Sequence, residues 1–241
     1  MTETSLLFIA FITSSLAGAL GMGGGILLIA CMPGLLPVQA ILPLHAVTQL
    51  ASNGSRLGLG WRHIDWRLVP ALLAGAALGA VVGGSLYREL DLRWLPGLIG
   101  ILILLITWAR LPSFSRGGQW ALALLGFYQT SLGMLAGATG PLGAAVLRHF
   151  GQGRDWLVVN TAVYMSINHA LRVFAFALLG FGFGPWLGLL SGMVIASVAG
   201  SWCGTRVRHR IPQHKFQWIF KWLVTLLAVR MIALAVLPAF S

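Results

Sequence analysis

Hydrophobic residues along this chain gather in long continuous runs that are separated by short polar stretches. A helix needs roughly 20 apolar residues to cross a bilayer, and eight runs are close to that length or longer. They cover about residues 5–31, 41–60, 68–87, 95–111, 120–147, 156–179, 184–203 and 217–237. No stretch between them is long enough for a soluble domain. The pattern therefore predicts an all-α, multi-pass membrane protein with about eight transmembrane helices.

Two of these runs contain an interruption where a membrane span should be most regular. Residues 18–27 read GALGMGGGIL, and each glycine costs a helix roughly 1 kcal/mol relative to alanine. Residues 133–143 read GMLAGATGPLG, in which Pro141 also removes a backbone donor. Irregular backbone at membrane depth is tolerated where it faces protein or a water-lined cavity. We expect helices broken at both places, although close helix packing through small residues is an alternative.

The two interrupted runs occupy matching places in an internal repeat. An offset of 116 residues aligns scarce residues of the two halves, among them Gly21 with Gly137, Arg56 with Arg172, and Pro96 with Pro212. This predicts two four-helix repeats, 1–115 and 116–241, within one membrane domain. Transporters often place the substrate site between such repeats. Four spans per half favour parallel repeats, whereas a re-entrant hairpin at a glycine segment would invert them.

Charge is scarce and strongly basic, since 9% of the residues are charged and the net charge is +11. Most of the arginines lie in short loops between spans, where the positive-inside bias places them, so we expect no nucleic-acid partner. Eight basic residues follow the third, fifth and seventh runs, and four follow the second, fourth and sixth, which places both termini away from the cytoplasm. The N-terminus lacks a basic n-region and a cleavage site, which favours a first span over a signal peptide.

The carboxylates limit the chemistry of the membrane interior. All five lie in loops or at the N-terminus: Glu3, Asp65, Glu89, Asp91 and Asp155. Cation carriers often use intramembrane carboxylates, so an anionic substrate fits this chain better. Cys31 and Cys203 have no metal-binding or disulfide spacing. We therefore expect no metal site, no cofactor and no catalytic residue.

A polar stripe follows each glycine segment on an otherwise apolar helix. Helical spacing puts the polar residues of each stripe on one face, which should point away from lipid. Helix breaks expose N–H groups that attract anions, and arginine forks suit sulfite, sulfonates or carboxylates. The candidate substrate-binding residues are Gly21, Gly23, Gly24, Gly25, His45, Thr48, Gln49, Asn53, Arg56, Thr139, Gly140, Pro141, Tyr164, Asn168, His169 and Arg172.

Each of these features also has a plainer interpretation. The stripes could make hydrogen bonds between helices, and the arginines could snorkel to the membrane interface. The histidines could carry protons, because imidazole titrates near physiological pH, or they could be structural.

Several short motifs resemble the sulfite exporter TauE/SafE family of membrane permeases. They are Gly21–Gly25, Pro33, HAVTQL (45–50), the basic loop WRHIDWRL (61–68) and a weaker second copy. The second copy departs from the first, because it reads GATGPLG (137–143) and TAVYMS (161–166). The resemblance implies a bacterial inner-membrane carrier for sulfur-containing anions such as sulfite or organosulfonates.

The resulting hypothesis is a permease that moves a small sulfur-containing anion across the inner membrane by rocking one half against the other. Linkage to protons is left open. Its partners are the anionic substrate and the lipid bilayer, and a homo-oligomer is left open. One alternative is an anion channel. Another is an intramembrane lipid-modifying enzyme, which no carboxylate within the spans would support.

Overall fold

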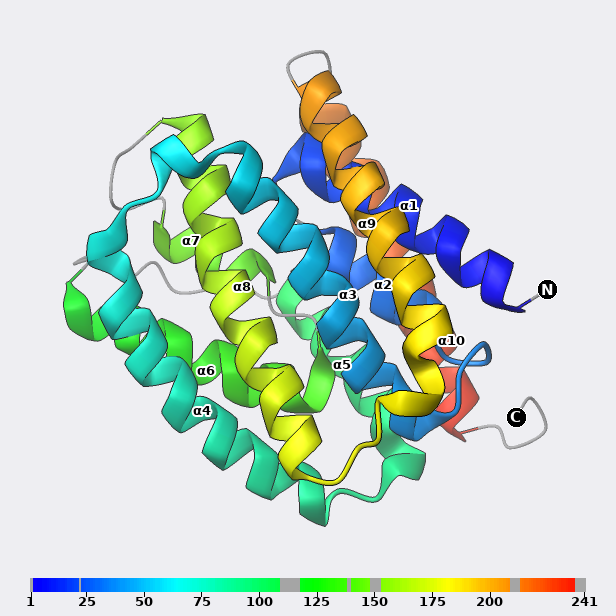
Figure 1. The fold of residues 1–241 in the computed structure, drawn as a ribbon. Coiled ribbons are helices and arrows are strands. Elements are labelled where there is room, and N and C mark those ends of the chain that lie inside the picture. The colour runs from blue at the N-terminus through cyan, green and yellow to red at the C-terminus, as the bar shows by residue number, and fades with distance from the viewer. Residues whose placement is uncertain are drawn as a thin grey trace.

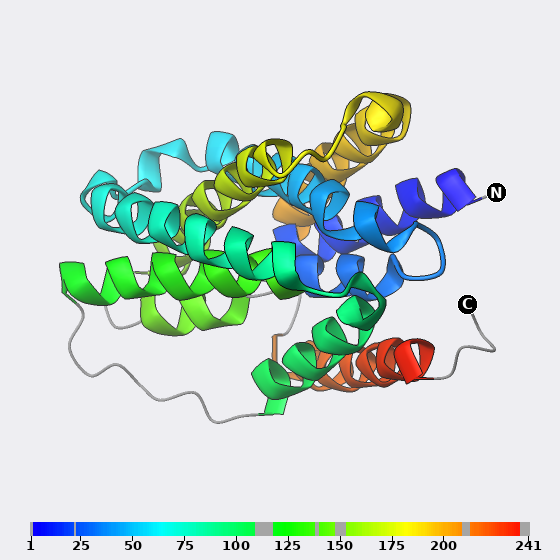
Figure 2. The same cartoon turned by 90° about the horizontal axis from the view of Figure 1, so that it is seen from below.

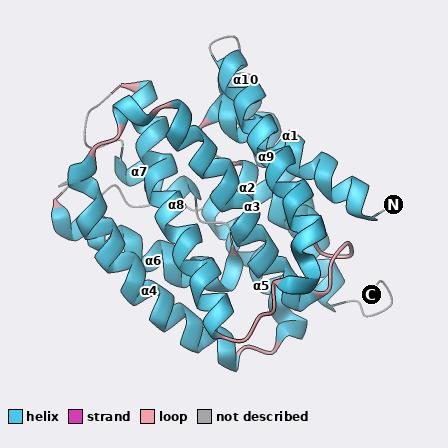
Figure 3. Cartoon of the chain, in the orientation of Figure 1, coloured by secondary structure: helices cyan, strands magenta, loops and turns pink. Residues whose placement is uncertain are grey.

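Helices joined by short loops and turns make up the described structure, a computed structural model that covers residues 2–21, 23–108, 118–137, 140–147, 153–208 and 213–236 (Figure 1). Within these ranges, the side chains of 141, 142, 144, 145, 154 and 213–217 are not described. The helices are α1 (Thr2–Leu20), α2 (Gly24–Cys31), α3 (Val38–Leu59), α4 (Val69–Glu89), α5 (Leu95–Trp108), α6 (Gln119–Ala136), α7 (Gly140–Leu147), α8 (Arg154–Leu178), α9 (Leu187–Val207) and α10 (Gln213–Val236). The described ranges contain no extended strand, which confirms the all-α class (Figure 3).

The helices follow the predicted apolar runs closely. Within the described ranges, four stretches are long and apolar enough to cross a membrane: Thr2–Leu20, Trp66–Glu89, Gly184–Val207 and Trp218–Val236. Helices α3 and α8 contain 22 and 25 residues and are also long enough, but their polar stripes make them less apolar. The chain is a polytopic helical membrane protein, as predicted.

Both glycine segments interrupt their helices where the sequence predicts a break. Helix α1 ends at Leu20 and α2 begins at Gly24, whereas α6 ends at Ala136 and α7 begins at Gly140. The turn glycines Gly21, Gly23 and Gly137 have φ angles of +86°, +97° and +72°. L side chains rarely adopt this left-handed conformation, so the turns require glycine.

The short helix after each break folds back and forms a hairpin with the helix before it. Gly24 lies against Thr13 of α1, although a continuous helix would separate these residues by about 16 Å. In the second half, Leu147 at the end of α7 shares a core cluster with Leu122 near the start of α6. The segments α1–α2 and α6–α7 are therefore helical hairpins and not continuous helices.

Two helix pairs pack in parallel through glycines. Helices α1 and α9 meet at Leu7 with Gly192, Phe11 with Gly200 and Ser15 with Gly204. Helices α4 and α6 meet at Gly75 with Ala123, Gly79 with Phe127 and Gly83 with Ser131. Small residues let the backbones approach closely, which is a common way of packing membrane helices. These two pairs make the most extensive helix contacts among the described residues.

The central helices α3 and α8 run antiparallel. His45 lies beside His169, with ring centroids 5.7 Å apart, and Gly60 just after α3 lies against Val159 near the start of α8. Helices α5 and α10, which pack together at one side of the molecule (Figure 2), are also antiparallel. Parallel repeats would point these matching helices in the same direction, so that expectation is wrong. The physical reason is that each hairpin adds one reversal of the chain to its half.

The hairpins also change which loops share an end of the molecule. Arg62 lies at the end where α3 finishes and α8 begins, and Arg208 lies there too because it pairs with Asp155 at 3.1 Å. Arg88 lies at the opposite end of α4. The predicted grouping of Arg88 with Arg208 is therefore wrong. The start of α1 lies at the same end of the molecule as Arg88. The placement of both termini away from the cytoplasm stays a prediction of the positive-inside rule.

Candidate functional site

A small cavity of about 30 Å³ lies between α3, α8 and the turns of both hairpins. Many of the predicted site residues line it: Gly21, Gly23, Gly24, Gly25, His45, Gln49, Asn53, Arg56, Gly140 and His169. The lining also includes Ala17, Ile26, Gly137, Thr161 and Met165, which were not predicted as site residues. The repeat offset of 116 would have found Gly137 from Gly21 and Thr161 from His45. The three apolar residues carry no chemical signal in the sequence.

Four other predicted residues are buried but do not line the cavity: Thr48, Tyr164, Asn168 and Arg172. Thr48 donates to Leu44 O at 2.8 Å and lies against Met193 of α9. Tyr164 donates to Gly140 O at 2.6 Å and thereby ties α8 to α7. Asn168 Nδ2 donates to Thr130 Oγ1 of α6 at 3.3 Å. Thr139 and the side chain of Pro141 lie outside the described residues.

The polar stripe on α3 is wider than the cavity, so one side of it lines the cavity and the other side contacts α9. Its cavity side carries His45, Gln49 and Asn53, whereas its other side meets α9. There, Ser52 Oγ lies 3.0 Å from Ser201 Oγ. Hydrogen bonding between helices therefore accounts for one side of the stripe, as the alternative interpretation held.

Each histidine of the cavity makes one hydrogen bond that fixes the role of a ring nitrogen. His45 Nε2 lies 2.9 Å from Gly25 O, so this nitrogen carries a proton and donates. His169 Nδ1 lies 3.1 Å from Arg172 Nη1 and must accept, because a guanidinium only donates. Among the described residues, nothing bonds to His45 Nδ1 or His169 Nε2. His45 Nδ1 therefore remains as a free acceptor, and His169 Nε2 remains as a free donor.

The two arginines cap the helices that precede the breaks. Arg56 Nη1 donates to Ala17 O at 3.3 Å and to Gly21 O at 3.1 Å, at the end of α1. Arg172 Nη1 donates to Gly137 O at 3.3 Å, at the end of α6. Cations are favourable at helix C-termini. The side chains are buried, with 5% and 0% of each residue exposed, so neither arginine snorkels to the interface.

The cavity has a positive charge that no carboxylate of the described chain balances. Asp155 engages Arg208 at 3.1 Å, at the end of the molecule. Asp91 is bound by Arg93, whose N–H groups lower the pKa of that exposed carboxyl below its usual value. Buried charges are normally paired, because an isolated one is costly. The region around Arg56 and Arg172 therefore favours an anion.

Further donors point at the same cavity. Gly24 and Gly25 line it and form the first turn of α2, where backbone N–H groups have no partner within the helix. This end of a helix is also the positive end of its dipole. Gln49 Nε2 is buried and has no acceptor among the described residues. The cavity thus offers side-chain and backbone donors together.

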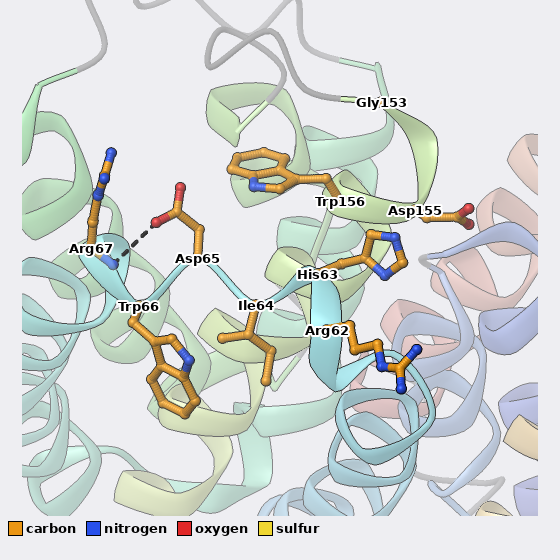
Figure 4. A pocket seen from close by; sticks show the side chains of 9 residues that line it. All are labelled: Arg62, His63, Ile64, Asp65, Trp66, Arg67, Gly153, Asp155 and Trp156. Carbon is orange, nitrogen blue, oxygen red and sulfur yellow. Dashed lines mark hydrogen bonds between the residues drawn. The ribbon is translucent and has the colours of Figure 1, made fainter.

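A larger hollow of about 740 Å³ opens at the end of the molecule where α3 finishes and α8 begins (Figure 4). It contains charges of both signs and two tryptophans; its lining residues are Arg62, His63, Ile64, Asp65, Trp66, Arg67, Gly153, Asp155 and Trp156. Asn160 of α8 holds the loop that lines it, because Nδ2 donates to His63 O at 2.9 Å and Oδ1 accepts from Asp65 N at 2.9 Å. The smaller cavity lies deeper along the same two helices.

Comparison with known proteins agrees with this architecture. The model of the sulfite exporter TauE/SafE family matches residues 6–231. A protein of Comamonas testosteroni named probable inner membrane transporter protein TsaS is 37% identical over 111 residues. That match covers 45% of this chain and 42% of the relative, so less than half of the relative is aligned. No solved structure matches the chain.

Proposed function

Since this chain belongs to the sulfite exporter TauE/SafE family, we propose that it is a permease for a small sulfur-containing anion, sulfite or an organosulfonate. Its relative is named as an inner membrane transporter, and we propose the same membrane for this chain. Membership of the family makes the chain a membrane transporter. The substrate and the coupling are the proposal.

The observation that carries the proposal is the pair of buried arginines without a carboxylate. Arg56 lines the cavity, and Arg172 lies on the antiparallel helix α8 and bonds to the cavity residue His169. Every carboxylate of the described chain lies at a helix end or in a connection. An anionic substrate would supply the missing negative charge. Sulfite and sulfonates present several acceptor oxygens, which suits the donors of Gln49, His169 and the first turn of α2.

The small extent of the cavity, about 30 Å³, favours a permease over a channel, because a conducting channel needs a continuous path through the protein. Transport then requires the site to open toward one side and then the other, as in alternating access.

The histidine environment argues against the enzyme alternative. A general base is normally oriented by a partner that stabilises its protonated form. His169 is instead held by the guanidinium of Arg172, which opposes protonation of the ring. We therefore propose that the chain is not an enzyme.

Uptake of radiolabelled sulfite and methanesulfonate into proteoliposomes tests the proposed function. We expect saturable uptake of at least one anion, reduced by Arg56→Ala and by Arg172→Ala without loss of membrane insertion. Arg93→Ala is the matched control, because Arg93 is exposed and pairs only with Asp91 at the end of α4. Normal transport by the double variant Arg56→Ala/Arg172→Ala would remove the arginines from the mechanism. Repeating the assay with a pH gradient tests linkage to protons.

A further inference from the structure

The two buried arginines differ in how completely their donors are used. In Arg56, Nε donates to Ser52 O at 3.3 Å, and Nη1 donates to the two carbonyls at the end of α1. Its Nη2 donates to Asn53 Oδ1. All three nitrogens of Arg56 are therefore bound within the protein.

Arg172 occupies the matching position but leaves part of its guanidinium free. Only Nη1 makes hydrogen bonds, to Gly137 O and His169 Nδ1. Its Nε and Nη2 have no acceptor among the described residues, although Arg172 is fully buried. Leaving buried donors unsatisfied is costly. This cost is recovered when a ligand provides the acceptors.

The free nitrogens of Arg172 lie on one edge of the guanidinium. Nε–H and one N–H of Nη2 point in the same direction and form a fork that matches two oxygens of one oxyanion. The fork borders Gly133 of α6, because a methyl group added there would lie 3.2 Å from Arg172 Cδ and 3.5 Å from Nε. Glycine therefore lets α6 pack directly against Arg172, and a larger residue at position 133 would press on the guanidinium.

The side chain of Asn168 also lies against Gly133. Its Oδ1 has no donor and would lie 3.3 Å from a methyl group at Gly133, whereas Nδ2 donates to Thr130 Oγ1. A threonine hydroxyl can donate as well as accept. The amide can therefore turn over when an anion arrives, so that Nδ2 faces the anion and Thr130 donates to Oδ1.

We infer that Arg172 binds the oxyanion group of the substrate through its Nε–Nη2 fork, and that Arg56 is a positioning residue that holds the turn after α1. This inference rests on the proposed function and names the side of the site that recognises the substrate. It also makes the site unequal: the second half recognises the anion, while the first half holds its hairpin in place.

Ligand-dependent thermal stabilisation of the purified protein tests the division of roles. Arg172→Lys and Arg56→Lys both retain the charge but lose the fork. We expect Arg172→Lys to weaken binding of sulfite about tenfold or more, the effect of losing a charge-assisted hydrogen bond. We expect Arg56→Lys to lower the ligand-free melting temperature and maximal uptake, while its affinity for sulfite stays within about threefold of wild type because its fork makes no substrate contact.

Gly133→Ala provides a second variant that leaves all charges in place. The added methyl group crowds the fork, so we expect weaker binding of sulfite. The matched control is Gly58→Ala, since a methyl group at Gly58 of α3 meets no atom within 4 Å. This control should bind sulfite as the wild type does.

The outcomes separate this inference from the proposed function. If sulfite stabilises Arg172→Lys as strongly as it stabilises wild type, the inference is wrong while the permease proposal stands. Equal losses of affinity in both lysine variants would also overturn the division of roles. If neither sulfite nor methanesulfonate stabilises the folded wild type, with sodium chloride as the control, then the substrate proposal and the inference both fail.

Discussion

His45 and His169 approach each other from different helices, and only His169 is bonded directly to an arginine. A protonated His169 could not accept the hydrogen bond from Arg172 Nη1, since both ring nitrogens would then donate. Binding of a proton and retention of this hydrogen bond therefore exclude each other. This competition is a physical route by which protons could be linked to the arginine that we assign to the substrate.

Replacing His169 by glutamine tests this route. A glutamine oxygen can still accept from Arg172 but does not titrate near neutral pH. We expect His169→Gln to transport sulfite without the acceleration that an imposed pH gradient gives to wild type. His63→Gln is the control, because His63 is exposed in the large hollow. If His169→Gln responds to the gradient as wild type does, His169 is not the linking group.

At the scale of single residues, the few polar residues within the apolar runs were the most useful guide to the candidate site. Polar residues are costly within a membrane, so those in α3 and α8 were expected to face inward, and they are buried. Helical spacing could not separate His45, which lines the cavity, from Ser52, which bonds to α9. Both lie on the same inward side, and only the packing partners distinguish them.

At the scale of helices, the glycine segments illustrate what local sequence can and cannot determine. The cluster Gly21–Gly25 predicts that a helix ends, because glycine stabilises left-handed turns and weakens helices. It does not determine the angle at which the next helix leaves. That angle depends on close packing such as Gly24 against Thr13, which no local pattern reveals.

Alanine at the turn glycines tests the hairpins. A non-glycine residue in the left-handed conformation costs about 1–2 kcal/mol, and a methyl group at Gly21 would also lie 2.7 Å from Val158 Cγ2. We expect Gly21→Ala and Gly137→Ala to lower the melting temperature and to reduce sulfite uptake. Gly54→Ala on α3 is the control, since a methyl group there meets nothing within 4 Å. Unchanged stability in both turn variants would contradict the hairpin geometry.

At the scale of the whole molecule, the tightest packing crosses between the predicted repeats 1–115 and 116–241. Helix α4 packs on α6, and α9 packs on α1. We propose that the two halves are inverted repeats that exchange these helices. Rocking one half against the other would pull apart both glycine-lined interfaces. We propose instead two moving bodies, one made of α1–α3 with α9 and the other of α6–α8 with α4. The two bodies meet along α3 and α8 beside the cavity.

A cross-link between α3 and α8 tests this division into bodies. A Cβ atom at Gly60 would lie 3.6 Å from Val159 Cβ, within the range of a disulfide. In a background without Cys31 and Cys203, we expect oxidised Gly60→Cys/Val159→Cys to stop transport and a reductant to restore it. The control pair, Gly100→Cys with Met231→Cys, joins α5 to α10, where the Cβ distance is 3.3 Å.

That control pair should transport in both redox states, because α5 and α10 lie to one side of the two bodies. Full transport by the oxidised α3–α8 pair, with the disulfide verified by mass spectrometry, would show that these helices need not separate. The moving bodies would then have to be drawn differently.

The repeat offset and the apolar runs could be obtained from sequence because they depend on composition and local order. The directions of the helices could not, since one hairpin per half reverses every later helix. The same reversal moved Arg88 to the end opposite Arg208. Counting spans alone therefore predicted the wrong grouping of loops even though the helix positions were nearly correct.

Exchange of labelled sulfite across proteoliposome membranes tests the central claim most directly. The account predicts saturable entry of labelled sulfite. Entry should accelerate when the vesicles contain unlabelled sulfite, because a carrier with sulfite bound reorients faster across the membrane than an empty carrier. The account also predicts that Arg172→Lys raises the sulfite concentration needed for half-maximal entry. Entry that never saturates, or no entry of sulfite or methanesulfonate through a folded wild-type protein, would contradict an arginine-lined carrier site for a sulfur oxyanion.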